Sequence, residues 1–431
     1  MSLGLSITII LFLLLLMLGV PLVFSIGFSS VTYFLLSGNI ALITIIPERF
    51  VTGMDSFTLM AIPLFIFMGE LMSKGGITDD LTDLCNFFVG RFRGGLAHSN
   101  VLVSTLFAGI SGSALADVGA LGSTLVPAMV KSGYDLEFSS AVTVASSVQG
   151  PLIPPSIPAL LVAGVTGLSV GAIFLAGAIP GLLTGLACCV VVFILARKRA
   201  YPVHDVKWTW RGFAEVLGKS ALALITPLII LGGVLGGFFT VTESAAIAAA
   251  YALVLVFIVK KMDIRIIADI LKTTVTTTAV SYILLGMVSI FSWIVANEQL
   301  PQKLTTMLAS FSDSPYVLLM VLNVFLVFWG MFMDVGAAIV IFAPLIYPVL
   351  TSFGVHPIHL SAILVFNLMI GLTTPPFGTL LFLCAGITGV DFGKLVKEMV
   401  PFYIAELIVL AMITYIPAVS LFLPRLAGFL N

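Results

Sequence analysis

The chain has 431 residues, of which 60% are hydrophobic and only 9% are charged, and its mean hydropathy is +1.21. Soluble domains carry about 25% charged residues, so no water-soluble fold could bury this much apolar surface, and the lipid bilayer must be the solvent. The formal net charge of −1 supplies no field that would attract nucleic acid, which excludes that class of partner.

Apolar segments along the chain are long enough to cross the membrane. About 20 apolar residues span a bilayer as a helix. The segments predicted to do so are 3–20, 22–45, 56–73, 138–167, 171–197, 219–239, 242–260, 274–296, 358–389 and 401–423. The first has no basic region before it, so we interpret it as a retained membrane helix and not as a signal peptide. The more charged segments are expected at the membrane surface as amphipathic helices or loops: 78–93, 199–214, 262–273, 297–310 and 391–400.

Lysine and arginine predict the orientation, because cytoplasmic loops carry more of them. One connection is crowded with basic residues and is therefore predicted to be cytoplasmic: Arg197, Lys198, Arg199, Lys207 and Arg211. Counting spans from this connection places those with Lys260 and Lys394 inside as well. The breaks at 297–316 and 351–359 hold only Lys303 and fall outside, and both ends of the chain are expected to face the periplasm or exterior.

Two further apolar stretches, 98–131 and 315–351, are predicted to enter and leave the membrane on the same side. By the charge pattern, the flanks of the first are both cytoplasmic and the flanks of the second are both external. Each stretch is broken in its middle, at 109–113 and at 330–334. Non-helical backbone at membrane depth is tolerated only where it is buried in protein or lines a cavity, so the tips of these re-entrant hairpins should mark a cavity.

The two hairpins belong to an internal repeat. One set of residues recurs later in the chain with the same spacing: Asp117, Gly119, Ala120 and Pro127 match Asp334, Gly336, Ala337 and Pro344. Further matches follow in the same order: Gly150, Pro154 and Pro155 with Gly371, Pro375 and Pro376. Because the copies start from opposite sides of the membrane, they are inverted repeats. That arrangement is typical of secondary transporters, whose sites lie near the bilayer midplane.

A predicted helix in each copy is interrupted by glycine and a Pro-Pro pair, over 149–155 and 371–376. Proline lacks an N–H group and clashes with the preceding turn, so these stretches should be unwound, with free carbonyl groups. Such carbonyls are suitable ligands for dehydrated Na⁺, and exposed half-helix N-termini suit an anionic substrate. Nearby hydroxyls supply further ligands: Ser111, Ser113, Thr373 and Thr374. The alternative, that these residues are only packing kinks, is less consistent with a matched pair in each copy.

Carboxylates inside the predicted spans are candidates for function, because an ionisable group in the membrane is costly. Asp117 and Asp334 are matched by the repeat and follow the hairpin tips, where each either ligates an ion or caps the second hairpin helix. Glu243 stands at an external helix start and is expected to be an N-terminal cap. Glu70 and Glu406 lie near span centres or ends, and the sequence assigns them no role.

Motifs of other membrane machines are missing from the sequence. No G-x-x-x-x-G-K-[ST] loop occurs, so no ATP-driven step is encoded in this chain. Ser113 has no histidine partner at membrane depth, which disfavours an intramembrane hydrolase. An ion channel built on two re-entrant loops is one alternative. A stand-alone Na⁺- or H⁺-coupled anion symporter or antiporter of the same architecture is another.

Long motifs in chain order resemble the large membrane subunit of tripartite ATP-independent periplasmic (TRAP) transporters. They are DSFTLMAIPLFIFMGELM (55–72), GISGSALADVGALGSTLVPAM (109–129), GPLIPPSIP (150–158), GGFFTVTESAA (236–246), GMFMDVGAAIVIFAPLIYPV (330–349) and GLTTPPFG (371–378). The resemblance covers essentially the whole chain. It implies an elevator-type fold in the bacterial inner membrane: all-α and polytopic, with inverted repeats, two re-entrant hairpins and two unwound helices.

The resemblance also implies a set of site residues. One Na⁺ site is expected between the first hairpin tip and the first unwound stretch, at Ser111, Gly112, Ser113, Gly150, Ile153 and Pro155. A second is expected at Gly330, Gly371, Thr373 and Thr374, with the substrate between the two sites. Further substrate or coupling candidates are Asp117, Asp334, Gln149 and Met331. The moving transport domain is expected to comprise 98–168 and 311–390, and scaffold and arm helices are expected in 1–97, 169–310 and 391–431.

Partners and substrate class follow from the resemblance as well. It implies a Na⁺-coupled importer of an organic acid that works with a small four-helix membrane subunit and a soluble periplasmic substrate-binding protein. Because this chain begins directly with the large subunit, the small subunit is expected to be a separate chain. The family handles C4-dicarboxylates, sialic acids, keto acids and sugar acids. We expect sialic acid or another sugar acid here, although no residue of the sequence chooses among them.

Overall fold

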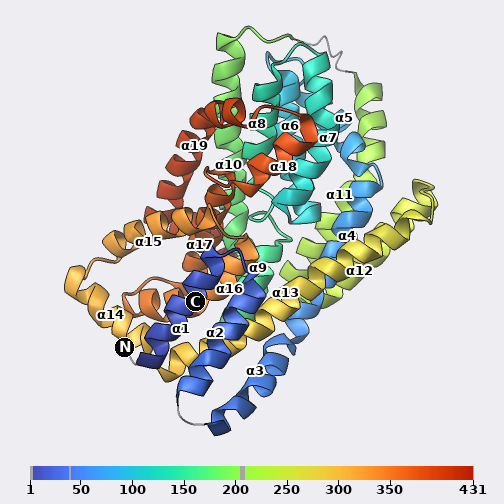
Figure 1. Ribbon diagram of the computed structural model, residues 1–431. Coiled ribbons are helices and arrows are strands. Elements are labelled where there is room, and N and C mark those ends of the chain that lie inside the picture. The colour runs from blue at the N-terminus through green and yellow to red at the C-terminus, as the bar shows by residue number, and fades with distance from the viewer. Residues whose placement is uncertain (1–2, 38–39, 204–208, 431) are drawn as a thin grey trace.

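The computed structural model describes residues 3–37, 40–203 and 209–430, and all regular structure in these ranges is helical (Figure 1). The earlier helices are α1 (Leu3–Met17), α2 (Leu22–Leu36), α3 (Ile45–Met54), α4 (Ala61–Lys74), α5 (Ile77–Val89), α6 (Gly95–Ser111), α7 (Ala114–Lys131), α8 (Leu136–Ser147), α9 (Ile157–Thr166) and α10 (Val170–Lys198), with short 3-10 helices at Ile40–Thr44 and Phe57–Met60. The later helices are α11 (Trp210–Leu235), α12 (Val241–Val254), α13 (Ile266–Asn297), α14 (Leu300–Phe311), α15 (Pro315–Gly330), α16 (Val335–Ser352), α17 (Pro357–Thr373), α18 (Thr379–Thr388), α19 (Phe392–Tyr415) and α20 (Ala418–Leu426), with a π-helical segment at Leu255–Val259.

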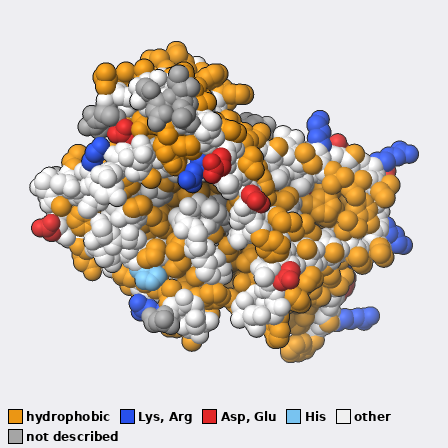
Figure 2. Space-filling model, turned by 90° about the horizontal axis from the view of Figure 1, so that it is seen from below, with side chains coloured by type: hydrophobic (Ala, Val, Ile, Leu, Met, Phe, Trp, Pro, Cys, Tyr) orange, Lys and Arg blue, Asp and Glu red, His pale blue; other side chains and the backbone are white. Residues whose placement is uncertain are grey.

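The helices have the length and composition of membrane spans. Seven of the described helices are long and apolar enough to cross a bilayer, and up to nine spans result if each of two bent helix pairs counts as one. The surface is largely apolar, and Figure 2 shows only scattered charged side chains on the face that it views. These features confirm the predicted all-helical, polytopic membrane fold.

One predicted span is wrong in length. The segment 22–45 is not a single helix, because α2 ends at Leu36 and α3 begins only at Ile45, after a 3-10 turn. The sequence Ser37-Gly38-Asn39 consists of residues that favour turns over helix, which accounts for the interruption.

Other spans begin earlier than predicted. α11, α13 and α19 start at Trp210, Ile266 and Phe392, so parts of the segments 199–214, 262–273 and 391–400 continue into spans and are not separate surface elements. Capping residues explain two of these starts, because Thr209 and Asp391 each accept a hydrogen bond from a backbone N–H of the first turn. Of the basic residues that predict the orientation, Lys207 lies outside the described residues.

Helices α6 and α7 form the first hairpin, and both of its outer ends lie against the C-terminal end of α10. Gly94, directly before α6, packs so closely there that an added Cβ would lie 2.5 Å from the Cβ of Ala196. Asp135, directly after α7, forms an ion pair with Arg199 at 3.4 Å. The chain therefore enters and leaves this hairpin at one end, as the charge pattern predicts for a re-entrant element.

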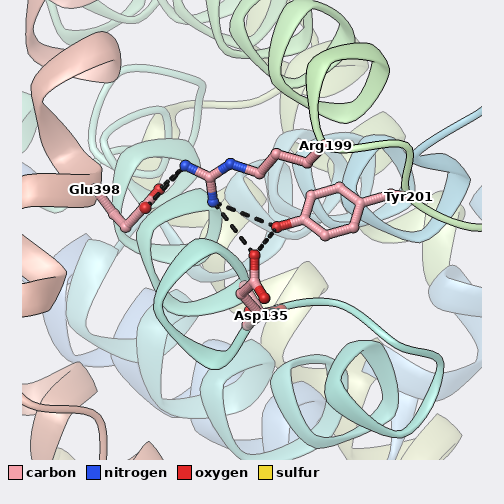
Figure 3. Close-up of polar contacts among 5 residues, drawn as sticks. Asp135, Arg199, Tyr201 and Glu398 are labelled. Atoms are coloured by element: carbon pink, nitrogen blue, oxygen red, sulfur yellow. Dashed lines mark hydrogen bonds and ion pairs between the residues drawn. The ribbon is translucent and has the colours of Figure 1, made fainter.

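A polar cluster ties the base of the first hairpin to the second half of the chain (Figure 3). Arg199 contacts both carboxylate oxygens of Glu398 on α19, at 2.8 and 2.9 Å, and Tyr201 donates a hydrogen bond to Asp135 at 2.5 Å. Burial lowers the pKa of Arg199, but its bonds to Glu398 and Tyr201 outweigh burial and raise it overall. Burial and the bond to Asp135 raise the pKa of Tyr201 to about 12, so the phenol remains a donor at neutral pH.

Helices α15 and α16 form the second hairpin, whose outer ends lie against the C-terminal end of α19. The ring of Tyr316, at the start of α15, lies 6.1 Å from the ring of Tyr415 at the end of α19. His359, which follows α16 after a short connection, lies 3.3 Å from the backbone oxygen of Thr414 and 2.7 Å from the hydroxyl of Ser420. This hairpin also enters and leaves at one end.

Helix α19 shows that the two hairpins open toward opposite ends of the molecule. Its first turns contact the base of the first hairpin through Lys394 and Glu398, and its last turn contacts the base of the second. The helix has 24 residues, which gives a length of about 36 Å at 1.5 Å per residue, close to the thickness of a bilayer. Figure 1 accordingly places α6 and α7 in the upper half and α15 and α16 in the lower half. The repeats are inverted in space.

An asparagine on the first helix of each hairpin binds that hairpin to the neighbouring broken helix. Asn100 of α6 donates to Thr143 of α8 at 2.7 Å, and Asn323 of α15 accepts from Asn367 of α17 at 2.8 Å. All of these side chains except Asn323 are fully buried. Buried polar contacts have no competing water, so each hairpin and its broken helix are held together as one unit.

Candidate functional site

The first hairpin ends in a tight tip at 111–113. Gly112 has a φ of +60°, a left-handed conformation that favours glycine, and it terminates α6. Ser113 then begins α7, and its hydroxyl accepts a hydrogen bond from the backbone N–H of Ala116 at 3.4 Å. The tip therefore brings a helix C-terminus, a helix N-terminus and two serine hydroxyls to one place.

This tip lies directly on the first loop, which we define as the unwound residues 148–156 between α8 and α9. A Cβ added to Gly112 would collide with the carbonyl oxygen of Pro155, and one added to Gly150 would lie 3.2 Å from the backbone of Ser113. Side chains at either position would force the segments apart. The structure thus brings together the predicted set at the first site through backbone contacts of Gly112, Ser113, Gly150 and Pro155.

The first loop is ordered by its own hydrogen bonds. The hydroxyl of Ser156 donates to the carbonyl oxygen of Pro151 and accepts from the backbone N–H of Ala159 at 3.1 Å, which caps α9. The backbone oxygen of Gln149 accepts from the N–H of Ile153 at 3.0 Å. The Pro154–Pro155 bond is cis, as is Pro375–Pro376 in the second loop, residues 374–378 between α17 and α18.

The second hairpin tip, residues 331–334, packs on the end of α17 in the same way. A Cβ added to Gly371 would lie 2.5 Å from the backbone of Gly330 and 2.9 Å from the amide nitrogen of Met331. The helix continues through Gly371 to Thr373, so the predicted unwound stretch begins only at Thr374. The hydroxyl of Thr374 donates to the carbonyl oxygen of Ile370 at 2.7 Å.

A central cavity joins the two tips. Its volume is about 170 Å³, and its wall includes Gly112 and Ser113 from the first tip and Asp334 from the second. α9 and α17 complete the wall from the two broken helices, and α13 closes it from the side. The N-termini of α7 and α16 both border this space, so the positive ends of two helix dipoles meet there.

A larger cavity of about 500 Å³ lies beside the first tip. Ser111 and Ser113 border it, and it extends along α7 and α4 as far as Glu70, which pairs with Lys74 at 3.5 Å. Because α4 leads through α5 into the base of the first hairpin, the cavity lies on that side of the tip. The charge pattern predicts that this side is cytoplasmic.

Some predicted site residues face away from the central cavity. The side chain of Gln149 is fully buried, where it accepts from Thr105 at 2.7 Å and packs against Gly185 of α10. The side chain of Ile153 also packs on α10, at Gly181. Thr373 faces α19, where Tyr403 donates to its carbonyl oxygen at 2.5 Å. Two residues along a helix are about 200° apart, which explains why Thr373 and Gly371 point in different directions.

The two repeat-matched aspartates occupy different environments. Asp334 is exposed and caps α16 by accepting from the backbone N–H of Gly336 at 2.9 Å, so it matches the capping interpretation. Asp117 is fully buried between the hairpin helices and accepts a hydrogen bond from Ser104. Its other carboxylate oxygen has no partner among the described residues. Ser113, and not Asp117, caps α7.

Sequence reasoning missed the contribution of α13 to the site. Thr277 borders both the central cavity and the larger one, and Ser281 borders the central cavity. The run Thr273-Thr274-Val275-Thr276-Thr277-Thr278 is an unusual density of hydroxyls in an apolar segment, and this signal could have identified the helix. The expected cap at Glu243 is present, since Thr240 and Glu243 form a reciprocal capping box at the start of α12.

Comparison with known proteins places this geometry in a family. Residues 9–419 match the model of the family described as "Tripartite ATP-independent periplasmic transporter, DctM component". The chain is 38% identical to the sialic acid TRAP transporter large permease protein SiaM of Vibrio cholerae, over 95% of each chain. It is 37% identical to the C4-dicarboxylate TRAP transporter large permease protein DctM of Pseudomonas aeruginosa, over 94% of each. It is also 33% identical to the sialic acid TRAP transporter permease protein SiaT of Haemophilus influenzae, over 97% of this chain and 68% of that one.

Solved structures share the fold at low sequence identity. The YdaH transporter of Alcanivorax borkumensis matches 91% of this chain and 89% of its own, with a TM-score of 0.61 and 16% identity. MtrF of Neisseria gonorrhoeae matches 90% and 85%, with a TM-score of 0.51 and 12% identity. These similarities support the arrangement of helices and nothing about substrate.

The close approach of the second tip to α17 predicts the effect of a single methyl group. We expect Gly371→Ala to lower stability by roughly 1–3 kcal/mol, because the new Cβ overlaps the backbone of Gly330. Gly386→Ala on α18 is the matched control, since nothing lies within 4 Å of a Cβ there. Alanine favours helix over glycine by about 1 kcal/mol, so the control should be neutral or stabilising. Thermal unfolding of the purified protein measures both, and equal midpoints would contradict the packing described.

Proposed function

The chain belongs to the DctM family of tripartite ATP-independent periplasmic transporters, and from this premise we propose that it is a Na⁺-coupled importer of an organic acid. As a family member it is the large permease of a TRAP transporter, a multi-pass protein of the bacterial inner membrane and not an enzyme. The ion, the substrate, the mechanism and the partners are the parts that we propose.

The observation that carries the proposal is the central cavity between the two hairpin tips. A transporter with inverted repeats binds its substrate near the midplane, where discontinuous helices meet. Here the N-termini of α7 and α16 face the same space, with hydroxyls from Ser113, Thr277 and Ser281 in its wall. Positive helix ends and hydroxyl donors suit a carboxylate with further hydroxyl groups. A sialic acid, another sugar acid or a C4-dicarboxylate has this chemistry, and relatives with such names support the class.

Na⁺ coupling is supported by the backbone at the two tips. At the first tip, Ser111, Gly112 and Ser113 lie against the loop at Gly150 and Pro155, where carbonyl and hydroxyl oxygens converge. At the second tip, Gly330 and Met331 meet Gly371, with Thr374 one turn further along. Sites with several neutral oxygens suit a dehydrated Na⁺ ion. The buried carboxylate of Asp117 stands behind the first tip, and we assign it the role of counter-charge for the ion there.

We further propose an elevator motion in which each hairpin moves with its broken helix. The buried asparagine contacts of Asn100 and Asn323 support this, because they bind each hairpin to its partner helix. The division into transport halves at 98–168 and 311–390 stays a prediction. TRAP transporters have three components, so this permease works with further subunits. We propose that these are a small four-helix membrane subunit and a periplasmic binding protein, since SiaT extends well beyond the region that this chain matches.

Uptake into proteoliposomes tests the proposed function. With the small subunit, the binding protein and an inward Na⁺ gradient present, we expect accumulation of the organic acid, and we expect none when the binding protein is left out. Uptake by the large subunit alone would favour the stand-alone symporter or antiporter. Currents without saturable, Na⁺-dependent exchange would instead indicate a channel.

The Na⁺ sites are tested by removing one hydroxyl from each. We expect Ser111→Ala and Thr374→Ala to raise the Na⁺ concentration needed for half-maximal uptake about tenfold, because each loses one oxygen ligand. Thr306→Ala on α14 is the control, since its hydroxyl is exposed and bonds only within its own helix. Both site variants should fold normally. Wild-type Na⁺ dependence of uptake in both would refute the assigned sites.

A further inference from the structure

Glu406 is a carboxylate in the interior of the membrane part with no role in the proposed sites. It lies in the middle of α19, and only 1% of its surface is exposed. Among the described residues, neither of its carboxylate oxygens has a hydrogen-bond partner, and no cation is paired with it. A buried, unpaired carboxylate costs several kcal/mol in a protein interior, so something absent from the protein chain should compensate it.

The oxygen of a second residue faces this carboxylate. The side chain of Thr373 lies within interaction range of Glu406, and the hydroxyl proton of Thr373 is directed to the carbonyl oxygen of Ile370 at 2.8 Å. The hydroxyl therefore presents lone pairs to the carboxylate. Oxygen atoms that face one another without a hydrogen between them repel, unless a cation lies between them.

The position of Thr373 is fixed by α19 itself. Tyr403 lies one turn before Glu406 on the same face of this helix and donates to the carbonyl oxygen of Thr373 at 2.5 Å. Cys188 of α10 lies on the other side of the carboxylate and is also buried. The pocket around Glu406 is thus closed by α10, α17 and α19, and it lies on the opposite side of α17 from the contact between Gly371 and Gly330.

From this geometry we infer that Glu406 and Thr373 bind a monovalent cation, separate from the two ions at the hairpin tips. One carboxylate balances one positive charge, whereas a divalent ion would leave net charge in the membrane. Carboxylate and hydroxyl oxygens are hard ligands, which suits Na⁺. The inference rests on the proposed Na⁺ coupling and adds a bound ion behind the second tip, which would hold α19 to the end of α17.

Binding of radiolabelled Na⁺ to the purified full-length chain tests this site. We expect Glu406→Gln, which keeps the size of the side chain but removes its charge, to bind one fewer Na⁺ per chain than the wild type. Glu398→Gln is the matched control on the same helix, and it should bind as many ions as the wild type. Without Na⁺, Glu406→Gln should unfold at the same temperature as the wild type or a higher one, because the uncompensated charge is gone.

A second variant keeps the test decisive if Glu406→Gln does not fold. Glu406→Asp retains the charge on a shorter side chain, and we expect its half-saturating Na⁺ concentration to rise about tenfold. Wild-type stoichiometry in Glu406→Gln, or wild-type half-saturation in Glu406→Asp, would overturn the inference. The first of these results is also what a permanently protonated Glu406 would give. If the wild type itself binds no Na⁺, the proposed function fails instead, so the two failures are distinguishable.

Discussion

The rest of the structure depends on one constraint: a helix broken inside the membrane exposes backbone polar groups that lipid cannot satisfy. Each break here is covered by the tip of a hairpin, and the cover fits only because Gly112 and Gly371 have no side chains. Such close approach gathers the carbonyl and amide groups of two segments in one protected place. The contact that makes a broken helix tolerable is therefore the contact that can supply oxygen ligands, and the two such places border one central cavity.

The inverted repeat reproduces this backbone arrangement more closely than it reproduces charge. Asp117 and Asp334 correspond in sequence, yet one is buried behind its tip and the other is an exposed helix cap. If the alignment is continued from Gly171 and Gly393, Glu406 corresponds to Thr184, a buried hydroxyl that bonds within its own helix. Each half thus contains one buried carboxylate, but at positions that the repeat does not relate. The halves can share a mechanism of movement while they differ in how they compensate an ion.

Sequence patterns predicted the parts of the fold that depend on local chemistry. Gly and Pro at 149–155 and 371–376 marked the two breaks, and lysine and arginine placed the hairpins at opposite ends. Boundaries such as the start of α13 at Ile266 were missed, because polar residues continue a capped helix beyond the lipid without changing its period. The side-chain directions of Gln149 and Thr373 depend on packing against α10 and α19, which no local pattern contains. Thr277 was missed for the same reason, since α13 reaches the site only through the tertiary fold.

The opposite orientation of the two hairpins is the central claim, and labelling from each side of the membrane tests it most directly. Single cysteines would replace Lys131 at the base of the first hairpin and Asp313 at the base of the second, both exposed, with Cys189 replaced by serine. A membrane-impermeant maleimide would then be added to either face of oriented vesicles. The account predicts that the cysteine at 131 reacts only from the cytoplasmic face and that at 313 only from the external face. Labelling of both from the same face would contradict it.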